Sequence, residues 1–244
     1  MLLVVCCVLL PARIGMADGS RGLEVQYIDF PPYYYPDAEG RPDGFLLKLA
    51  RHAFERAGVP VLSWECLPAK RVLVNLQLDR PLVSIGWFWT PERESVYKFS
   101  RLLYENKQLR AVYLKKQAAR FEGRNTLADL LRDKKLRLGL LDGYSLGPTA
   151  DAIIRREKPD AVRVVGGYGR MIGMLAEERF AYLLMSPEAI ESLIRKNHLN
   201  PAIFESQPLA DVIEGNKRYL MYSRAVPDEW IRRIDNALKE LPKE

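Results

Sequence analysis

Three aromatic residues, Trp87, Phe88 and Trp89, occupy consecutive positions in the segment SIGWFWTPERE, and Arg93 follows shortly after them. Large rings fill space and offer stacking and cation–π faces to a bound molecule. The planar guanidinium of an arginine pairs with a carboxylate through two parallel hydrogen bonds. That carboxylate can belong to a ligand, or to one of the two glutamates that flank the arginine in a purely structural ion pair.

A second candidate for chemistry is the segment GYSLG at 143–147, which fits the G-x-S-x-G pattern of a hydrolase nucleophile. Its serine, Ser145, lies between a predicted strand and a predicted helix, and Asp160 and His198 follow in the order of a hydrolase triad. However, no oxyanion-hole motif precedes the segment, and His198 stands in KNHLNP, which is typical of a helix end. Short matches also arise by chance, so hydrolysis is the minor alternative.

The composition gives little support to other kinds of chemistry. Two histidines, His52 and His198, are too few for an ordinary histidine-rich metal site, so we expect no metal and no cofactor. The formal net charge is +6, but the basic residues are scattered and form no stripe interleaved with aromatics, so we expect no nucleic-acid binding. Cys66 is the only cysteine beyond the first 17 residues, and we expect it to be a small core side chain.

The first 17 residues differ from the rest of the chain. LLVVCCVLL is an apolar run too short to span a bilayer as a helix. Gly15 and Ala17 then place small residues where a signal peptidase reads the chain. We therefore expect residues 1–17 to be a cleaved signal peptide and the mature protein to be soluble and periplasmic.

Predicted strands and helices alternate along the remainder of the chain, which favours an α/β fold with largely parallel sheets. Such sheets bind ligands at the carboxyl ends of their strands, where the loops FPPYYY, GWFWTPER, DGYSLG, GGYGR and MSPE are expected to lie. Strands are expected at 23–29, 59–65, 81–86, 108–116, 136–141, 161–165, 180–185 and 216–223. Helices are expected at 45–58, 68–78, 126–132, 145–158, 168–178, 186–196 and 227–241.

These loops, in this order, resemble the extracellular solute-binding proteins of family 3, which serve amino-acid ABC importers. The likeness is most specific in two segments. FPPYYYPDAEGRPDGFLLKLA flanks a proline pair with aromatics before a short hairpin, and TPERESVYKFSRLLYEN carries a Thr, an acidic residue and an Arg, then Phe-Ser and Tyr. Weaker agreement in LRLGLLDGYS, EERFAYLLMSPEA and YLMYSRAVPDEWIRRIDNALKEL extends it over nearly the whole mature chain.

The resemblance implies a bilobal periplasmic-binding-protein fold of α/β class. Each lobe would be a mostly parallel sheet flanked by helices, and the two would close on a ligand by a two-segment hinge. The first lobe is expected at 22–107 with 210–244 and the second at 108–209. The chain would cross between them near 105–116 and 204–211.

The resemblance also assigns binding roles. Arg93 falls where amino-acid-binding members clamp the ligand carboxylate, and Tyr144 and Ser145 fall where a helix N-terminus donates N–H groups to it. Phe30 falls where an aromatic stacks on the ligand, with Tyr33 beside it. Arg71 corresponds to a basic residue that faces the cleft in some relatives, although a surface role fits it equally well.

Two departures from the family pattern concern the rest of the ligand. Ser186 stands where the amino-acid receptors hold the ammonium group with an Asp, and its sequence context also fits a helix N-cap. Gly86 and the bulky rings of Trp87, Phe88 and Trp89 replace small hydroxyl residues of the amino-acid receptors. Without the ammonium-binding Asp, an ordinary α-amino acid is poorly served. The expected ligand-binding residues are Phe30, Tyr33, Arg71, Gly86, Trp87, Phe88, Trp89, Arg93, Tyr144, Ser145 and Ser186, with no catalytic residue and no metal ligand.

We therefore expect a monomeric, non-catalytic periplasmic protein that captures a small carboxylate-bearing ligand, which is also aromatic-compatible or cationic, and delivers it to an inner-membrane ABC permease. A ligand-sensing receptor that signals to a membrane partner is the first alternative, because it needs the same closing cleft. A hydrolase is the second. A dehydratase on the same fold is the third, although no paired carboxylate and base can be assigned to it.

Overall fold

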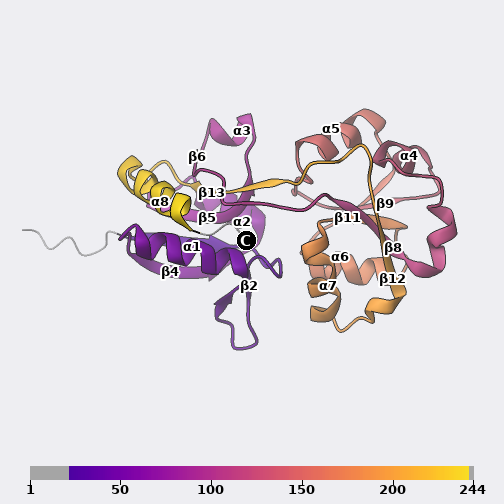
Figure 1. Cartoon of the computed structure of the whole chain (residues 1–244), viewed down its shortest axis with the longest axis horizontal. Helices are drawn as coiled ribbons and strands as arrows, with labels where there is room; N and C mark the ends of the chain where they lie inside the picture. The colour runs from indigo at the N-terminus through magenta and orange to yellow at the C-terminus, as the bar shows by residue number, and fades with distance from the viewer. Residues whose placement is uncertain (1–21, 242–244) are drawn as a thin grey trace, which may run out of the picture.

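The computed structural model describes residues 22–241. Within them the chain forms two α/β lobes that lie side by side and are joined by extended segments (Figure 1). The expected signal peptide, residues 1–17, lies outside the described residues. No helix within 22–241 has the length and apolar character needed to cross a membrane.

The first lobe is built on a sheet of six strands in the order β4-β1-β5-β13-β6, with β7 also paired to β13. Apolar residues on one face of the first helix pack against this sheet, and the last helix lies beside it, where Arg233 Nε donates to the Ala57 carbonyl at 2.8 Å. The strands are β1 (Leu23–Tyr27), β4 (Val61–Cys66), β5 (Leu82–Phe88), β6 (Lys98–Phe99), β7 (Tyr104–Glu105) and β13 (Lys217–Tyr222). The helices are α1 (Phe45–Arg56), α2 (Ala69–Asn75), α3 (Pro91–Glu94) and α8 (Asp228–Glu240), and a hairpin joins β2 (Tyr35–Pro36) to β3 (Pro42–Asp43).

The second lobe is a five-stranded sheet in the order β10-β9-β11-β8-β12. Its two faces belong to different buried apolar clusters, because α6 and α7 cover one face and α4 and α5 the other. The strands are β8 (Arg110–Leu114), β9 (Leu138–Leu141), β10 (Ala161–Val164), β11 (Tyr182–Met185) and β12 (Phe204–Pro208). The helices are α4 (Leu127–Arg132), α5 (Pro148–Glu157), α6 (Tyr168–Ala176) and α7 (Pro187–Lys196), with 3-10 turns η1 (Lys115–Arg120) and η2 (Pro201–Ile203).

Both sheets are mixed rather than mostly parallel. Strand β1 is parallel to β4 and β5, and β9 is parallel to β10 and β11. The strands that follow or precede a crossing between the lobes, β13, β8 and β12, run antiparallel to their neighbours. The expected α/β bilobal fold is confirmed, but its hinge strands break the parallel pattern, because they enter each sheet from the other lobe.

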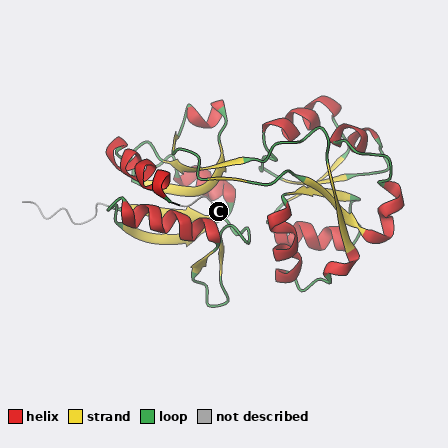
Figure 2. Ribbon diagram, viewed as in Figure 1, coloured by secondary structure: helices red, strands yellow, loops and turns green. Residues whose placement is uncertain are grey.

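The two crossings are shorter than the sequence suggests. The segments expected to cross, 105–116 and 204–211, instead contain the paired strands β8 and β12 of the second sheet. Leu209 and Val212 are buried in the core of the second lobe, so the return crossing begins only after them. Figure 2 shows the two crossings as neighbouring extended segments between the lobes.

Candidate functional site

A cavity of about 40 Å³ lies between the lobes and is lined by both of them. The first lobe contributes the ends of β1 and β5 together with side chains from α2, α3 and β13, and the second contributes the loop after β9 and the start of α6. Its lining contains two arginines and no acidic residue. The lining residues are Ile28, Phe30, Tyr34, Ala69, Ile85, Gly86, Trp87, Phe88, Arg93, Gly143, Tyr144, Ser145, Tyr168 and Arg218.

A bulge at the end of β5 shapes the floor of this cavity. The register between β5 and β13 shifts at this point and leaves Gly86 without a partner, with φ at +82°. A Cβ at this position would overlap the ring of Tyr34, so only glycine fits between the strand and that ring. The bulge turns the Gly86 carbonyl toward Arg218, whose Nη1 donates to it at 2.8 Å.

The three consecutive rings at the end of β5 and just beyond it separate into two groups. Trp87 and Phe88 line the cavity, and the Trp87 indole N–H is fixed by donation to Ser84 Oγ at 2.7 Å. Trp89 is 41% exposed and lies outside the cavity lining. The strand therefore delivers two rings to the site and sends the third to the surface.

Arg93 lines both the cavity and an outer hollow that adjoins it. Thr90 caps the short helix α3 by accepting from the Arg93 backbone N–H at 3.2 Å. The guanidinium lies 5.0 Å from the Trp87 ring centroid, and its Nη1 donates to the Phe88 carbonyl at 2.8 Å. Among the described residues it forms no ion pair with either neighbouring glutamate, so the purely structural alternative finds no support within residues 22–241.

Sequence reasoning missed the most deeply buried charge in the site, Arg218 on β13. Its side chain is 4% exposed and is surrounded by neutral groups. Nε donates to Asn106 Oδ1 at 2.6 Å, and Nη1 donates to Tyr34 Oη at 2.8 Å as well as to the bulge carbonyl. The guanidinium carbon also lies 4.3 Å from the centroid of Tyr33 and 5.0 Å from that of Phe88. No carboxylate within residues 22–241 lies at ion-pair distance from it.

The tyrosines around Arg218 cannot neutralise it at ordinary pH. Burial raises the pKa of Tyr33, Tyr34 and Tyr168 above the usual value, so all three are neutral phenols at pH 7. Burial lowers the pKa of Arg218 itself, but the interaction with these tyrosines raises it, and the net direction is upward. The cavity therefore borders a permanently charged cation that has no carboxylate at ion-pair distance within residues 22–241.

The second lobe closes the cavity with Tyr144, Ser145 and Tyr168. The Tyr168 ring stacks on Phe30 of the first lobe at a centroid distance of 3.7 Å and an interplanar angle of 10°. Burial raises the pKa of Tyr144 to about 12, so it is also neutral. Ser145 Oγ donates to Asp151 Oδ2 at 2.5 Å, and it accepts the Gly147 N–H at 3.0 Å.

These contacts give no support to the hydrolase alternative. The Ser145 hydroxyl is bonded to a carboxylate in the first turn of α5, and no hydrogen bond joins it to His198 in the described chain. Asp160 pairs with Arg137 at 3.1 Å instead of orienting a histidine. The three residues of the sequence pattern are therefore not connected as a triad.

Four of the residues expected at the site do not line the cavity. Tyr33 is fully buried behind Phe30, with ring centroids 5.0 Å apart. Arg71 is exposed on α2, and Trp89 is exposed as described above. Ser186 precedes α7 in the N-cap position but makes no capping bond; its Oγ accepts from Asn106 Nδ2 at 2.9 Å, in the same network that holds Arg218.

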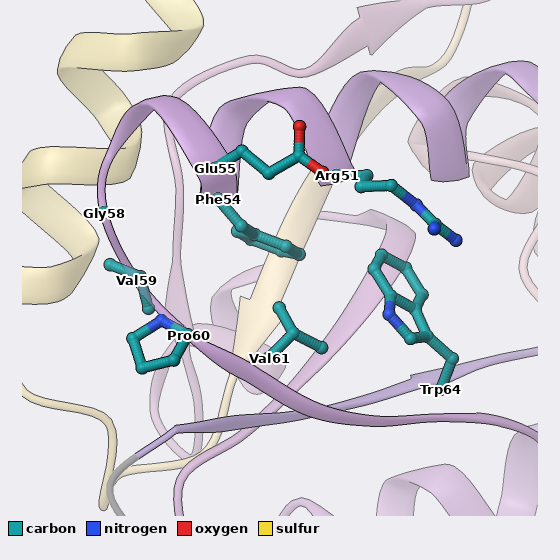
Figure 3. A pocket seen from close by; sticks show the side chains of 8 residues that line it. All are labelled: Arg51, Phe54, Glu55, Gly58, Val59, Pro60, Val61 and Trp64. Carbon is teal, nitrogen blue, oxygen red and sulfur yellow. The ribbon is translucent and has the colours of Figure 1, made fainter.

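Three other hollows lie at the surface of the described part of the chain, and two of them bear on the choice of site. One of about 300 Å³ adjoins the cavity, shares Arg93, Tyr144 and Ser145 with it, and adds Arg155 and Arg163 from the second lobe. A larger one of about 550 Å³ lies between α1 and β4, where Phe54, Val59, Val61 and Trp64 form an apolar wall and Arg51 lies over the Trp64 ring (Figure 3). Because this groove uses one lobe only and gathers few polar groups, the cavity between the lobes is the better candidate site.

Known structures share this architecture over most of the chain. An ancestral arginine-binding protein bound to arginine is 20% identical, with a TM-score of 0.71 over 90% of this chain and 92% of that one. A periplasmic binding protein of Salmonella typhimurium described as having high arginine specificity is 20% identical, with a TM-score of 0.67 over 91% and 93%. The holo form of ArgBP from T. maritima is 19% identical, with a TM-score of 0.69 over 92% of each chain. At these identities the likeness is one of fold.

The sequence itself matches a protein-family model over almost its full length. A comparison with curated protein sequences found no match. The model described as bacterial extracellular solute-binding proteins, family 3, matches residues 25–244. This chain belongs to that family of bacterial extracellular solute-binding proteins.

Proposed function

We propose that this protein captures a small carboxylate-bearing solute between its lobes by hinge closure and delivers it to an ABC importer in the inner membrane. The observation that carries the proposal is the cavity that both lobes line, which contains two arginines and no carboxylate. A site with that charge attracts an anionic group and disfavours a cation. The structural relatives described above include an ancestral arginine-binding protein bound to arginine, which is itself a carboxylate-bearing solute.

Arg93 is the proposed clamp for the solute carboxylate. One of its guanidinium nitrogens is fixed by the Phe88 carbonyl, and Trp87 supports the planar group from one side. The remaining N–H donors are available for a bidentate pair, which is the geometry that distinguishes Arg from Lys. Burial lowers the pKa of Arg93, but an arginine remains protonated at neutral pH.

Closure is supported by contacts that join the two lobes around the cavity. Lys70 Nζ lies 2.7 Å from Asp142 Oδ2, and Lys196 Nζ lies 2.7 Å from Asp29 Oδ1. Both pairs are solvent-exposed, and exposed pairs contribute little each. Weak contacts of this kind suit a cleft that must open and close repeatedly, because they favour the closed form by only a small free energy.

We further propose that the protein acts as a periplasmic monomer without catalytic activity. The expected signal peptide and the extracellular character of the family support export. No group of three or more His, Cys, Asp or Glu within residues 22–241 is arranged to hold a metal ion. The hydrogen bond of Ser145 to Asp151 gives its hydroxyl a structural role at the start of α5.

Calorimetry with an Arg93→Ala variant tests the proposed clamp. A thermal-shift screen of monocarboxylates, dicarboxylates and aromatic acids first selects a binder, since a ligand at 100 times its Kd stabilises by about 2.7 kcal/mol. Removing one partner of a desolvated charge pair typically costs about 3 kcal/mol, so Arg93→Ala should weaken binding roughly a hundredfold. Arg71→Ala, on the exposed side of α2, is the control and should bind as the parent does. Unchanged affinity in the Arg93 variant refutes the clamp.

A further inference from the structure

We infer that the solute carries two anionic groups and no ammonium group, and that Arg218 receives the second anion at the inner end of the cavity. The inference rests on the proposed function, because it specifies the ligand of the same site. The class of solute is a small dianion such as a dicarboxylate. Arg93 would bind one end of it and Arg218 the other.

The first support is the unbalanced charge of Arg218. Charged side chains that are almost fully buried are normally paired, because desolvation of a lone ion is strongly unfavourable. Arg218 has only an amide oxygen, a phenol and a backbone carbonyl as acceptors, and its Nη2 makes no hydrogen bond within the part of the chain that the structure describes. Since its side chain lines the cavity, a ligand anion can supply the missing charge.

Glu188 is an acid in the surrounding network, and its buried Oε2 has no hydrogen-bond partner within residues 22–241. Glu188 accepts the Tyr104 hydroxyl at 3.0 Å and the Lys107 N–H at 2.7 Å with its Oε1. It is outside the cavity lining, and it forms no ion pair with Arg218 among residues 22–241. Arg218 Nε instead donates a hydrogen bond to Asn106 Oδ1, which is a neutral oxygen.

The second support is the spacing of the two cations. Arg93 is bonded to the carbonyl of Phe88, and Arg218 is bonded to the carbonyl of Gly86. Carbonyls two residues apart in an extended strand are separated by about 7 Å, and the bulge at Gly86 shortens that path. Two guanidiniums anchored in this way suit acidic groups that are separated by a short chain or by one ring.

The third support comes from the outer hollow that adjoins the cavity. It adds two exposed arginines, Arg155 and Arg163, to the charge around Arg93. Among the described residues, the one acid that lines this hollow is Asp151. Its carboxylate accepts hydrogen bonds from the Ser145 hydroxyl and the Leu146 N–H, which hold it at the start of α5. The positive field from this entrance to Arg218 opposes the entry of an ammonium or guanidinium group.

A panel of matched acids tests the inference. Binding to the full mature chain is measured by thermal shift and calorimetry for succinate against butyrate, glutarate against valerate, and phthalate against benzoate. We expect at least one dianion to bind more than tenfold tighter than its matched monoanion, and we expect L-arginine and L-glutamine to bind more weakly than that dianion. The inference is overturned if no dianion exceeds its monoanion, or if L-arginine is the tightest ligand.

Asn106→Asp tests the role of Arg218 without removing the arginine. The substitution is isosteric and places a carboxylate at Arg218 Nε, while the hydroxyls of Tyr33 and Ser186 can turn to donate to it. Arg218 then has an internal counter-charge, so the preference for the dianion should fall at least tenfold while monoanion binding stays within threefold. The melting temperature without added solute should rise, because a buried lone charge is now paired.

Asn236→Asp is the matched control, since it makes the same chemical change on the exposed surface of α8. It should leave both the preference and the melting temperature unchanged. If Asn106→Asp also leaves the preference unchanged, Arg218 does not receive the second anion. If monoanions bind through Arg93 and dianions gain nothing, the proposed function stands and this inference fails; if no acid of the panel binds, both fail.

Discussion

Gly86 allows a direct test of how the bulge builds the site, through the substitution Gly86→Ala. A residue with a Cβ in the left-handed region is disfavoured by about 1 kcal/mol or somewhat more. At Gly86 the new Cβ would also overlap the ring of Tyr34, which is buried and accepts a hydrogen bond from Arg218. Overpacking typically destabilises by about 1–3 kcal/mol, and a disturbed hydrogen bond to a charged group by about 2 kcal/mol.

Gly40 provides the matched control for that prediction. Its φ is +78°, nearly the same as at Gly86, but no atom lies within 4 Å of a Cβ built there. Gly40→Ala should therefore show the conformational term alone, and Gly86→Ala should be about 3 kcal/mol less stable than Gly40→Ala. Urea denaturation followed by tryptophan fluorescence measures both. Equal destabilisation within about 1 kcal/mol would show that Tyr34 does not require a glycine beside it.

Two further predictions concern closure. Tyr168→Ala removes the stack on Phe30, which contributes about 1 kcal/mol, and should increase the radius of gyration measured by X-ray scattering without added solute. Tyr113→Ala is the control, because it removes the Tyr113–Phe121 stack inside the second lobe and should leave the radius of gyration unchanged. A change in both variants would contradict the role of the Phe30–Tyr168 stack in closure. Lys70 lowers the pKa of Asp142, so this inter-lobe pair is present above the ordinary carboxyl pKa and is lost as pH falls through the lowered value. The radius of gyration measured by scattering should therefore increase only at acidic pH, and Asp142→Asn should reduce that increase. An increase that begins near neutral pH would contradict the role of the Lys70–Asp142 pair in closure.

The alternation of strands and helices could be predicted from the sequence because helical and strand periodicities are local, and the bilobal fold was implied by the family resemblance. Phe30, Arg93, Tyr144 and Ser145 follow the ends of strands, and the structure brings all four to one cavity. That grouping remains a proposal for ligand binding. The crossings were displaced, because pairing of β8 and β12 within the second sheet depends on contacts distant in sequence.

Arg218 was missed because a cation in a strand usually faces solvent. A signal was present in NKRYLMYS, where Arg218 alternates in step with Leu220 and Tyr222, which are both buried. A charged residue on the buried side of a strand is an exception, and it indicates a functional role or a partner. The partner residues Asn106 and Tyr34 come from distant segments, so no local pattern could have assembled them. Ser186 likewise serves this network and not the capping bond that its sequence context suggests.

The stack of Phe30 on Tyr168 has a consequence for the concentration range in which the protein works. The two rings belong to different lobes, and the stack closes the cleft to about 40 Å³, room for only on the order of three waters. A solute must therefore first find molecules in which Tyr168 has moved away. The apparent Kd equals the intrinsic Kd divided by the fraction of such molecules, so a stacked population of about 90% weakens binding about tenfold. Substitutions at Tyr168 would then adjust the solute level at half saturation without altering either arginine.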